Sequence, residues 1–139
     1  MAITQAMCTS FKQEILQGVH EAADTYKIAL YTSAATLDAS TTVYSATNEV
    51  VGTGYTASGT TLAGFATSQS GTTAWIDWTT DPSWAAATIT ARGALIYNST
   101  QANKALIVLD FGSDKTSTAG TFTVVLPAAD ASNAIIRIG

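Results

Sequence analysis

The chain of 139 residues has few of the residues on which most catalytic and metal sites depend. It contains one cysteine, Cys8, so it can form no internal disulfide and no cysteine-based metal cluster. It contains one histidine, His20, so any catalytic triad or multi-histidine metal site would have to use that residue. We expect Cys8 to be a small apolar residue near the start of a helix and His20 to be solvated on the polar face of that helix. The sequence therefore predicts no catalytic residue, no cofactor and no metal.

Charge is also scarce. Charged residues make up 12% of the chain, about half the share that is usual in a soluble domain. The net charge is -4 and the six basic residues are scattered, which argues against nucleic-acid binding. No segment approaches the roughly 20 apolar residues of a membrane span, and the first residues lack the pattern of a signal peptide. We expect a protein without a nucleic-acid or membrane partner, which stays soluble until it assembles against other proteins.

The first 24 residues predict one amphipathic helix. From Ser10 to Asp24, apolar side chains including Phe11 and Ile15 recur on one face with Leu16 beside them, and the remaining positions are mostly polar. Ser10 and Gln13 are spaced as a capping box at its start. Gly18 lies in the middle of this helix, where it costs about 1 kcal/mol relative to alanine, so packing must hold the helix together.

From residue 25 onward the apolar period changes from that of a helix to that of a strand. Residues 25–32 alternate apolar and other side chains, which is typical of a half-buried strand. Residues 105–109 are apolar throughout and predict a central strand covered on both faces, and Gly93 predicts a β-bulge. Further strands are predicted at 61–66, 73–78, 87–98, 104–111, 120–127 and 133–139. The fold class is therefore mainly β: an antiparallel β-sandwich, jelly-roll-like or Ig-like, of about seven or eight strands with one N-terminal helix.

We predict a single domain over residues 1–139, with an N-terminal segment and helix at 1–24 and the β-sandwich at 25–139. A long loop interrupts the sandwich at about 33–60, with turns starting at Asp38 and Asn48 and at most a short strand at 49–51. Loops of this length often contact a partner.

Two pairs of carboxylates have spacings that could serve glycoside hydrolysis: Asp77 with Asp81, and Asp110 with Asp114. Each pair lies where a strand, a turn and a strand are expected, so we interpret all four as turn residues. The second pair flanks Gly112 and leaves calcium binding open as a weak alternative, since a calcium loop has further ligands. The sequence therefore predicts no enzyme.

All three tryptophans lie within the ten residues "WIDWTTDPSW", 75–84. In a strand that starts near Thr73, Trp75 and Trp78 point to opposite faces, which does not suit a flat sugar-binding platform. We favour a role in the core or at a subunit interface, where tryptophan concentrates. The candidate interface residues are Trp75, Trp78, Trp84, Tyr97, Tyr44 and Tyr55.

Several stretches resemble a group of small structural proteins from the virions of tailed bacteriophages: "MAITQAMCTSFKQEILQGVH", "YKIALYTSAATLDASTT", "NEVVGTGYTASGTTL", "TARGALIYNST" and "LDFGSDKTSTAGTFTVVLP". The resemblance covers nearly the whole chain and assigns no binding residue to any position. It implies a non-enzymatic component of a phage particle, made in the host cytoplasm.

Two functional hypotheses follow from this resemblance. The first is a capsid cement or decoration protein on the virion surface, which binds the lattice of the major capsid protein and forms a homo-oligomer, with a trimer favoured. The alternative is a tail or fibre component that binds a carbohydrate of the host surface, with Trp75, Trp84 or Tyr97 as stacking platforms.

Overall fold

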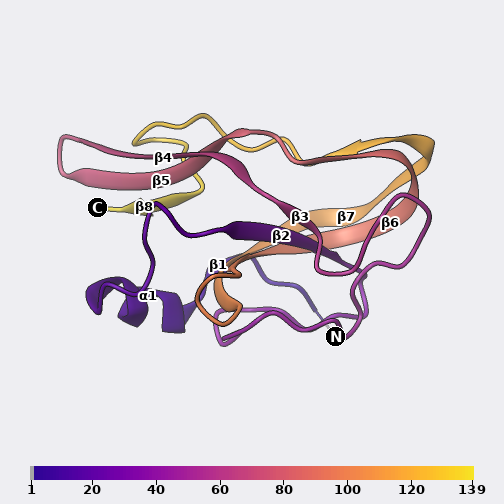
Figure 1. Cartoon of the computed structure of the whole chain (residues 1–139), viewed down its shortest axis with the longest axis horizontal. Helices are drawn as coiled ribbons and strands as arrows, with labels where there is room; N and C mark the ends of the chain where they lie inside the picture. Colours follow the sequence, from indigo (N-terminus) through magenta and orange to yellow (C-terminus); the bar gives the residue numbers. More distant parts are fainter. Residues whose placement is uncertain (1) are drawn as a thin grey trace.

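The computed structural model describes residues 2–139, and over this range the chain forms one helix and eight strands in two antiparallel sheets (Figure 1). The helix is α1 (Thr9–Leu16). The larger sheet has the order β1-β7-β6-β2-β3 and the smaller sheet the order β4-β5-β8. The strands are β1 (Ala6–Met7), β2 (Tyr26–Tyr31), β3 (Thr60–Thr61), β4 (Ala63–Ser70), β5 (Thr73–Thr80), β6 (Ser83–Asn98), β7 (Lys104–Thr123) and β8 (Ile136–Ile138). The predicted fold class is confirmed: the fold is mainly β and antiparallel, with one N-terminal helix.

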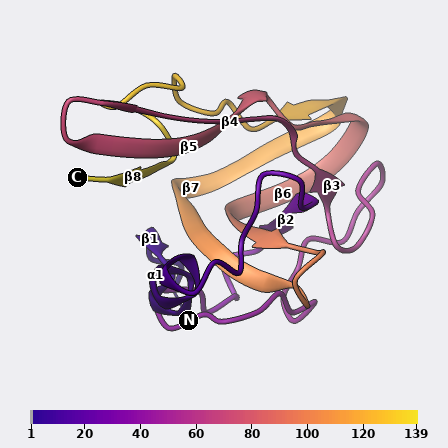
Figure 2. The ribbon, with the colours of Figure 1, turned by 60° about the vertical axis from the view of Figure 1, so that its left-hand side comes forward.

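Aromatic side chains join the two sheets. The ring of Tyr26 on β2 lies 5.6 Å from that of Phe65 on β4 and 5.4 Å from that of Trp78 on β5. Ring pairs at these separations add to the hydrophobic stabilisation that comes from their burial. Figure 2 shows the smaller sheet lying over one part of the larger one, while β8 and the C-terminus stand apart from α1 and β1. The two layers therefore meet at an aromatic contact but remain open on the side of α1 and β8.

The β6–β7 hairpin bears on two predictions. Its register shifts between Ala91 and Gly93, so the ladder is irregular at Gly93 as predicted, but the inserted residues, 111–114, are on β7 and not on the strand that contains Gly93. The separate strands expected at 104–111 and 120–127 are instead one strand, β7, which ends at Thr123. The stretch Asp110–Asp114 is therefore not a turn between two strands: it opposes Arg92 within a ladder that continues on both sides, with Gly112 at a φ of +79°. Both carboxylates face Arg92, with nitrogen–oxygen distances of 3.7 Å to Asp110 and 3.8 Å to Asp114.

The helix is shorter than predicted. It ends at Leu16 rather than near Asp24, because Gly18 takes a φ of +70° and stops it. The Gly18 N–H donates to the Ile15 carbonyl and the Val19 N–H to the Glu14 carbonyl, the pair of bonds that defines a Schellman C-terminus. The predicted capping box at Ser10 is also wrong, since the N-cap is Cys8 and no side chain caps the helix. No helix within residues 2–139 is long and apolar enough to cross a membrane.

The long loop between β2 and β3 spans residues 32–59. It forms no strand, and its β-type pairing is limited to isolated β-bridges. Asp38 starts a turn as expected: its Oδ1 accepts from the Ser40 N–H at 2.8 Å and its carbonyl from the Thr41 N–H at 3.0 Å. Asn48 also lies in a turn, with a φ of +60°. The single strand-like contact near residues 49–51 is a bridge between Glu49 and Tyr31.

Candidate functional site

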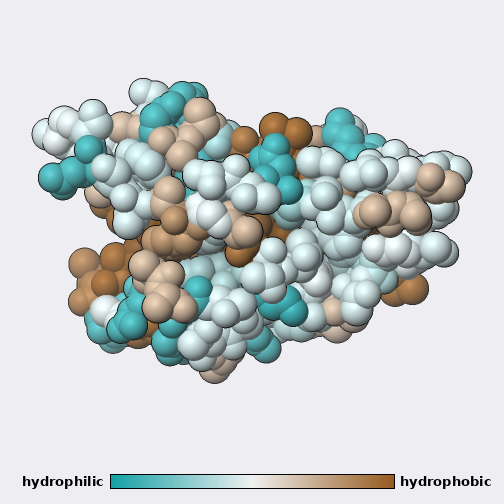
Figure 3. Space-filling model, turned by 45° about the horizontal axis from the view of Figure 1, so that its top comes forward, coloured by the Kyte–Doolittle hydropathy of each residue, from teal (hydrophilic) through white to brown (hydrophobic). Residues whose placement is uncertain are grey.

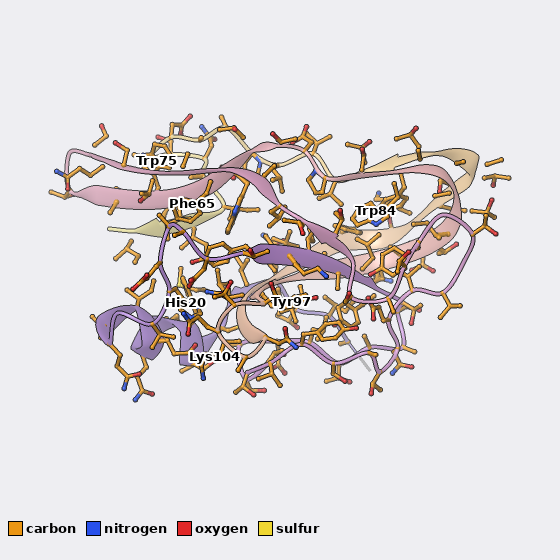
Figure 4. The ribbon with its side chains drawn as sticks, in the orientation of Figure 1. His20, Phe65, Trp75, Trp84, Tyr97 and Lys104 are labelled. Carbon is orange, nitrogen blue, oxygen red and sulfur yellow. The ribbon has the colours of Figure 1, made fainter. Side chains whose placement is uncertain are left out.

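The three tryptophans occupy separate places, although they are close in sequence. Trp78 is 2% exposed in the contact between the sheets, and Trp84 is 6% exposed between Tyr55 and Phe122. Trp75 is partly exposed on β5, and Figure 4 shows it at the opposite end of the molecule from Trp84. The tryptophans therefore form no common platform, and Trp75 alone offers part of its ring to solvent.

The tyrosines among the candidate interface residues surround a buried carboxylate. Tyr97 is 1% exposed, and its ring stacks on that of Tyr44 at 4.8 Å. Tyr44 and Tyr55 are partly exposed, and both donate their hydroxyl hydrogens to Glu49. An interface role stays a prediction for Trp75, Tyr44 and Tyr55, while Trp78, Trp84 and Tyr97 are packed inside the chain.

Glu49 was not singled out from the sequence, yet it holds the long loop on the sheet. Its Oε2 accepts from Tyr44 Oη at 2.7 Å, and its Oε1 accepts from Tyr55 Oη at 2.6 Å and from the Ser58 N–H at 2.8 Å. The carboxylate is buried, so these bonds replace the water that it loses. Tyr55 Oη in turn accepts from the Leu30 N–H at 2.9 Å, which links the loop to the backbone of β2.

Burial raises the pKa of every tyrosine in the chain. It is the main cause at Tyr26, whose pKa rises to about 12, and at Tyr31 and Tyr97. At Tyr44 and Tyr55 the hydrogen bond to Glu49 and its negative charge raise the pKa further. These phenols therefore stay protonated as donors and have no role as bases.

The two proposed carboxylate pairs are held in separate structural roles. Asp77 is not a turn residue as predicted but lies inside β5, where it is fully buried and its Oδ1 accepts from the Trp78 N–H at 2.8 Å. Burial raises the pKa of Asp77, and the charges of Asp81 and Asp130 raise it further. Asp81 accepts from the Leu126 N–H at 2.9 Å and fixes the segment that follows β7. Asp110 and Asp114 face Arg92, as described above. No cluster of three or more metal-ligating side chains occurs within residues 2–139.

His20 is buried rather than solvated, which corrects the expectation from the sequence. Because the helix ends at Leu16, the chain turns back and places the ring 5.0 Å from that of Phe11. Asn98 Nδ2 donates to His20 Nδ1 at 3.0 Å, and the Asn98 amide is oriented by its carbonyl oxygen, which accepts from two backbone N–H groups. His20 Nδ1 is therefore the acceptor, and its Nε2–H donates to Glu14 at 3.3 Å. Glu14 Oε2 also lies 3.4 Å from the Nζ atom of Lys104. Figure 4 labels His20 and Lys104.

Cys8 lies at the N-cap of α1 and is fully buried, as predicted. Burial, with the nearby charges of Asp38 and Glu14, raises the pKa of its thiol to about 11. The thiolate is the reactive form of cysteine, so this residue is inert near neutral pH.

An open apolar surface lies between α1 and β8, and we call it the α1/β8 groove. Two adjoining hollows form it, and both are lined by Ile15 and Ile138. Leu16 is 88% exposed beside it and Ile138 is 48% exposed. Figure 3 shows apolar surface gathered in the indentation between the two layers. The rest of the lining includes Met7, Lys12, Ile76, Ile136 and Arg137.

This groove was not predicted from the sequence. Leu16 was placed beside the apolar face of a longer helix, which would have packed it on the sandwich. The helix ends at that residue, and the C-terminal strand pairs only with β5. The signal that could have indicated it is Gly18, which is typical of the position just after a helix end. Comparison with protein-family models, with curated proteins and with solved structures finds no match to this chain.

Proposed function

We propose that the chain is a non-enzymatic structural protein of a tailed-phage virion, acting as a capsid cement or decoration protein that binds the lattice of the major capsid protein. The observation that supports this most directly is the α1/β8 groove, where large apolar side chains remain in contact with water. Exposed apolar surface of this kind is typical of a site that binds another protein. The resemblance to virion proteins described above supports the same role.

The energetics suit a protein that acts in many copies. Burying a leucine or isoleucine side chain contributes about 1.5–3 kcal/mol, so Leu16 and Ile138 supply a few kcal/mol per contact. Such a contact is weak between free subunits in dilute solution. It becomes strong when repeated over a lattice, because linked contacts form at a high effective concentration. The low share of charged residues strengthens such contacts further, because fewer charged groups lose water when the surface is buried.

The test is to locate the protein on intact particles. A tag on the chain is labelled with gold and viewed by electron microscopy, and the copy number is measured in the same preparation. Label over the whole head in hundreds of copies supports the proposal. Label confined to the tail in a few copies contradicts it. Binding to assembled shells but not to free coat subunits is the matching expectation in solution.

A second candidate function is favoured by the surroundings of Trp75. A shallow hollow beside this residue is lined by polar groups that include Gln69, Asp130 and Asn133. An aromatic face with amide and carboxylate groups around it is suited to a sugar ring. In a tail or fibre protein this hollow would bind a host-surface carbohydrate. Quenching of tryptophan fluorescence by a bacterial glycan, lost in Trp75→Leu, would favour this function over the first.

A further inference from the structure

We propose that the α1/β8 groove of one copy receives the loop around Val51 of a second copy, so that the chain associates head to tail. This inference rests on the proposed function and deepens it by naming the partner of the groove. The loop is residues 48–54, which we call the Val51 tip.

Val51 is the most exposed large apolar residue in residues 2–139, at 94%. Its neighbour Val50 is buried, and the Val50 N–H donates to the Leu30 carbonyl at 2.9 Å. On the other side the Thr88 N–H donates to the Thr53 carbonyl at 2.9 Å. The backbone around Val51 is thus anchored on both sides while its side chain points into solvent.

The tip is also packed closely against β6. A side chain at Gly52 would have its Cβ 2.5 Å from the Thr88 carbonyl oxygen, so only glycine fits there. Glu49, just before Val50, is fixed by its three hydrogen bonds. A rigid apolar projection loses little conformational entropy on binding, which makes it a good anchor for a hydrophobic groove.

The charges favour contact between a groove and a different surface of the next copy. Two basic residues, Lys12 and Arg137, line the groove, and no acidic side chain does. The remaining chain has ten acidic and four basic residues, because six basic residues occur in all and two of them line the groove. Residues 28–91, which contain the tip, include no lysine or arginine. Two grooves placed face to face would bring like charges together, whereas the tip has no lysine or arginine and brings no second positive charge to the groove.

The two surfaces lie at opposite ends of the molecule. In Figure 1 α1 and β8, which border the groove, are at the left, and the loop that contains residues 48–54 is at the right, beside β6. A contact between different surfaces is heterologous, and it produces a ring or a filament rather than a two-fold dimer. The exposed side chains at both ends of the long axis therefore imply assembly into more than two copies.

The experiment uses two variants of the full chain. Leu16→Glu disrupts the groove and leaves the tip intact, and Val51→Glu disrupts the tip and leaves the groove intact. Both side chains are exposed, so the fold is expected to survive, and circular dichroism checks this. Thr80→Glu is the matched control, because it adds the same charge at an exposed position on β5 outside both surfaces and outside the hollow beside Trp75. Ile138→Glu is a second groove variant.

Sedimentation measures the mass of each protein over a range of concentrations. We expect wild type and Thr80→Glu to form species larger than a dimer, and each disrupted variant alone to associate at least tenfold more weakly. Mixed in equal amounts, Leu16→Glu and Val51→Glu should form a one-to-one dimer and nothing larger, because only one intact groove can meet one intact tip. A mixture that stays monomeric, a variant that assembles alone as wild type does, or a monomeric wild type would each overturn the inference.

The same variants separate this inference from the proposed function. If Leu16→Glu and Val51→Glu associate normally with themselves but no longer decorate heads, the groove and tip bind the shell, and the head-to-tail contact is wrong while the virion role stands. If the mixture forms the one-to-one dimer but wild type never labels heads, the contact is supported and the cement function is wrong.

Discussion

Replacing Glu49 by alanine tests whether this buried carboxylate holds residues 32–59 on the sheet. The substitution removes three hydrogen bonds and leaves the hydroxyls of Tyr44 and Tyr55 without their acceptor. Hydrogen bonds to a charged group contribute about 1.5–3 kcal/mol each, and part of that total offsets the desolvation of the carboxylate. We expect Glu49→Ala to lower the free energy of unfolding by about 3–5 kcal/mol.

Urea unfolding followed by circular dichroism and by tryptophan fluorescence measures this change. Trp84 is a local reporter, because its ring lies 5.8 Å from that of Tyr55. Glu49→Gln is the matched control: its amide oxygen can still accept from one tyrosine and from the Ser58 N–H, so we expect a loss of about 1–2 kcal/mol. A loss below about 1 kcal/mol in Glu49→Ala would refute the reasoning, since the carboxylate would then do no more than occupy space.

Three further predictions concern stability. All five tyrosines have raised pKa values, so above about pH 10 the unfolded chain loses phenolic protons before the folded protein does. The free energy of unfolding should therefore fall as the pH rises, by up to about 1.4 kcal/mol per pH unit for each tyrosine. Absorbance at alkaline pH should show the tyrosines ionising together with unfolding. Burial raises the pKa of Asp77, so the stability that this carboxyl contributes is lost as the pH rises from its usual pKa through the raised one. Asp77→Asn keeps an acceptor for the Trp78 N–H and should therefore stabilise the fold at pH 7 and not at pH 3, as measured by urea unfolding; an equal change at both pH values would contradict this. Gly18→Ala should lower the free energy of unfolding, measured with heat or urea, by about 1 kcal/mol, because the φ of +70° is unfavourable for alanine. No atom lies within 4 Å of the added methyl group, so a clash contributes nothing to this loss. An unchanged stability would mean that the end of the helix shifts.

The sequence predicted the strands well where the pattern is local. The alternation at residues 25–32 corresponds to β2, although β2 is buried on both faces and not half-buried as predicted. The segment from Thr73 corresponds to β5, followed by the expected turn at Asp81 and Pro82 before β6. The irregularity at Gly93 was also predicted, although the inserted residues are on β7. Side chains of a strand alternate whatever the strand pairs with, so these features depend on a few neighbouring residues.

The misplaced elements depend on residues far apart in sequence. β7 continues past Asp110–Asp114 because its backbone pairs with β6 on both sides of this stretch, Asp110 with Gly93 and Lys115 with Ala91, which no local pattern indicates. His20 is buried because it meets Asn98, 78 positions later. The end of α1 is the exception: Gly18 gave a local signal, but the apolar period continues past it and predicted a longer helix.

The sequence by itself determined that the protein is mainly β, that a long loop precedes most of the strands, and that cysteine and histidine are too few for most chemistry. Only the tertiary structure decided that Glu49 is buried against Tyr44 and Tyr55, and that Leu16 and Ile138 stay exposed beside one groove while Val51 projects at the other end. Propensity and periodicity act over a few residues. Burial and exposure depend on which segments pack together, and that is settled only when the whole chain has folded.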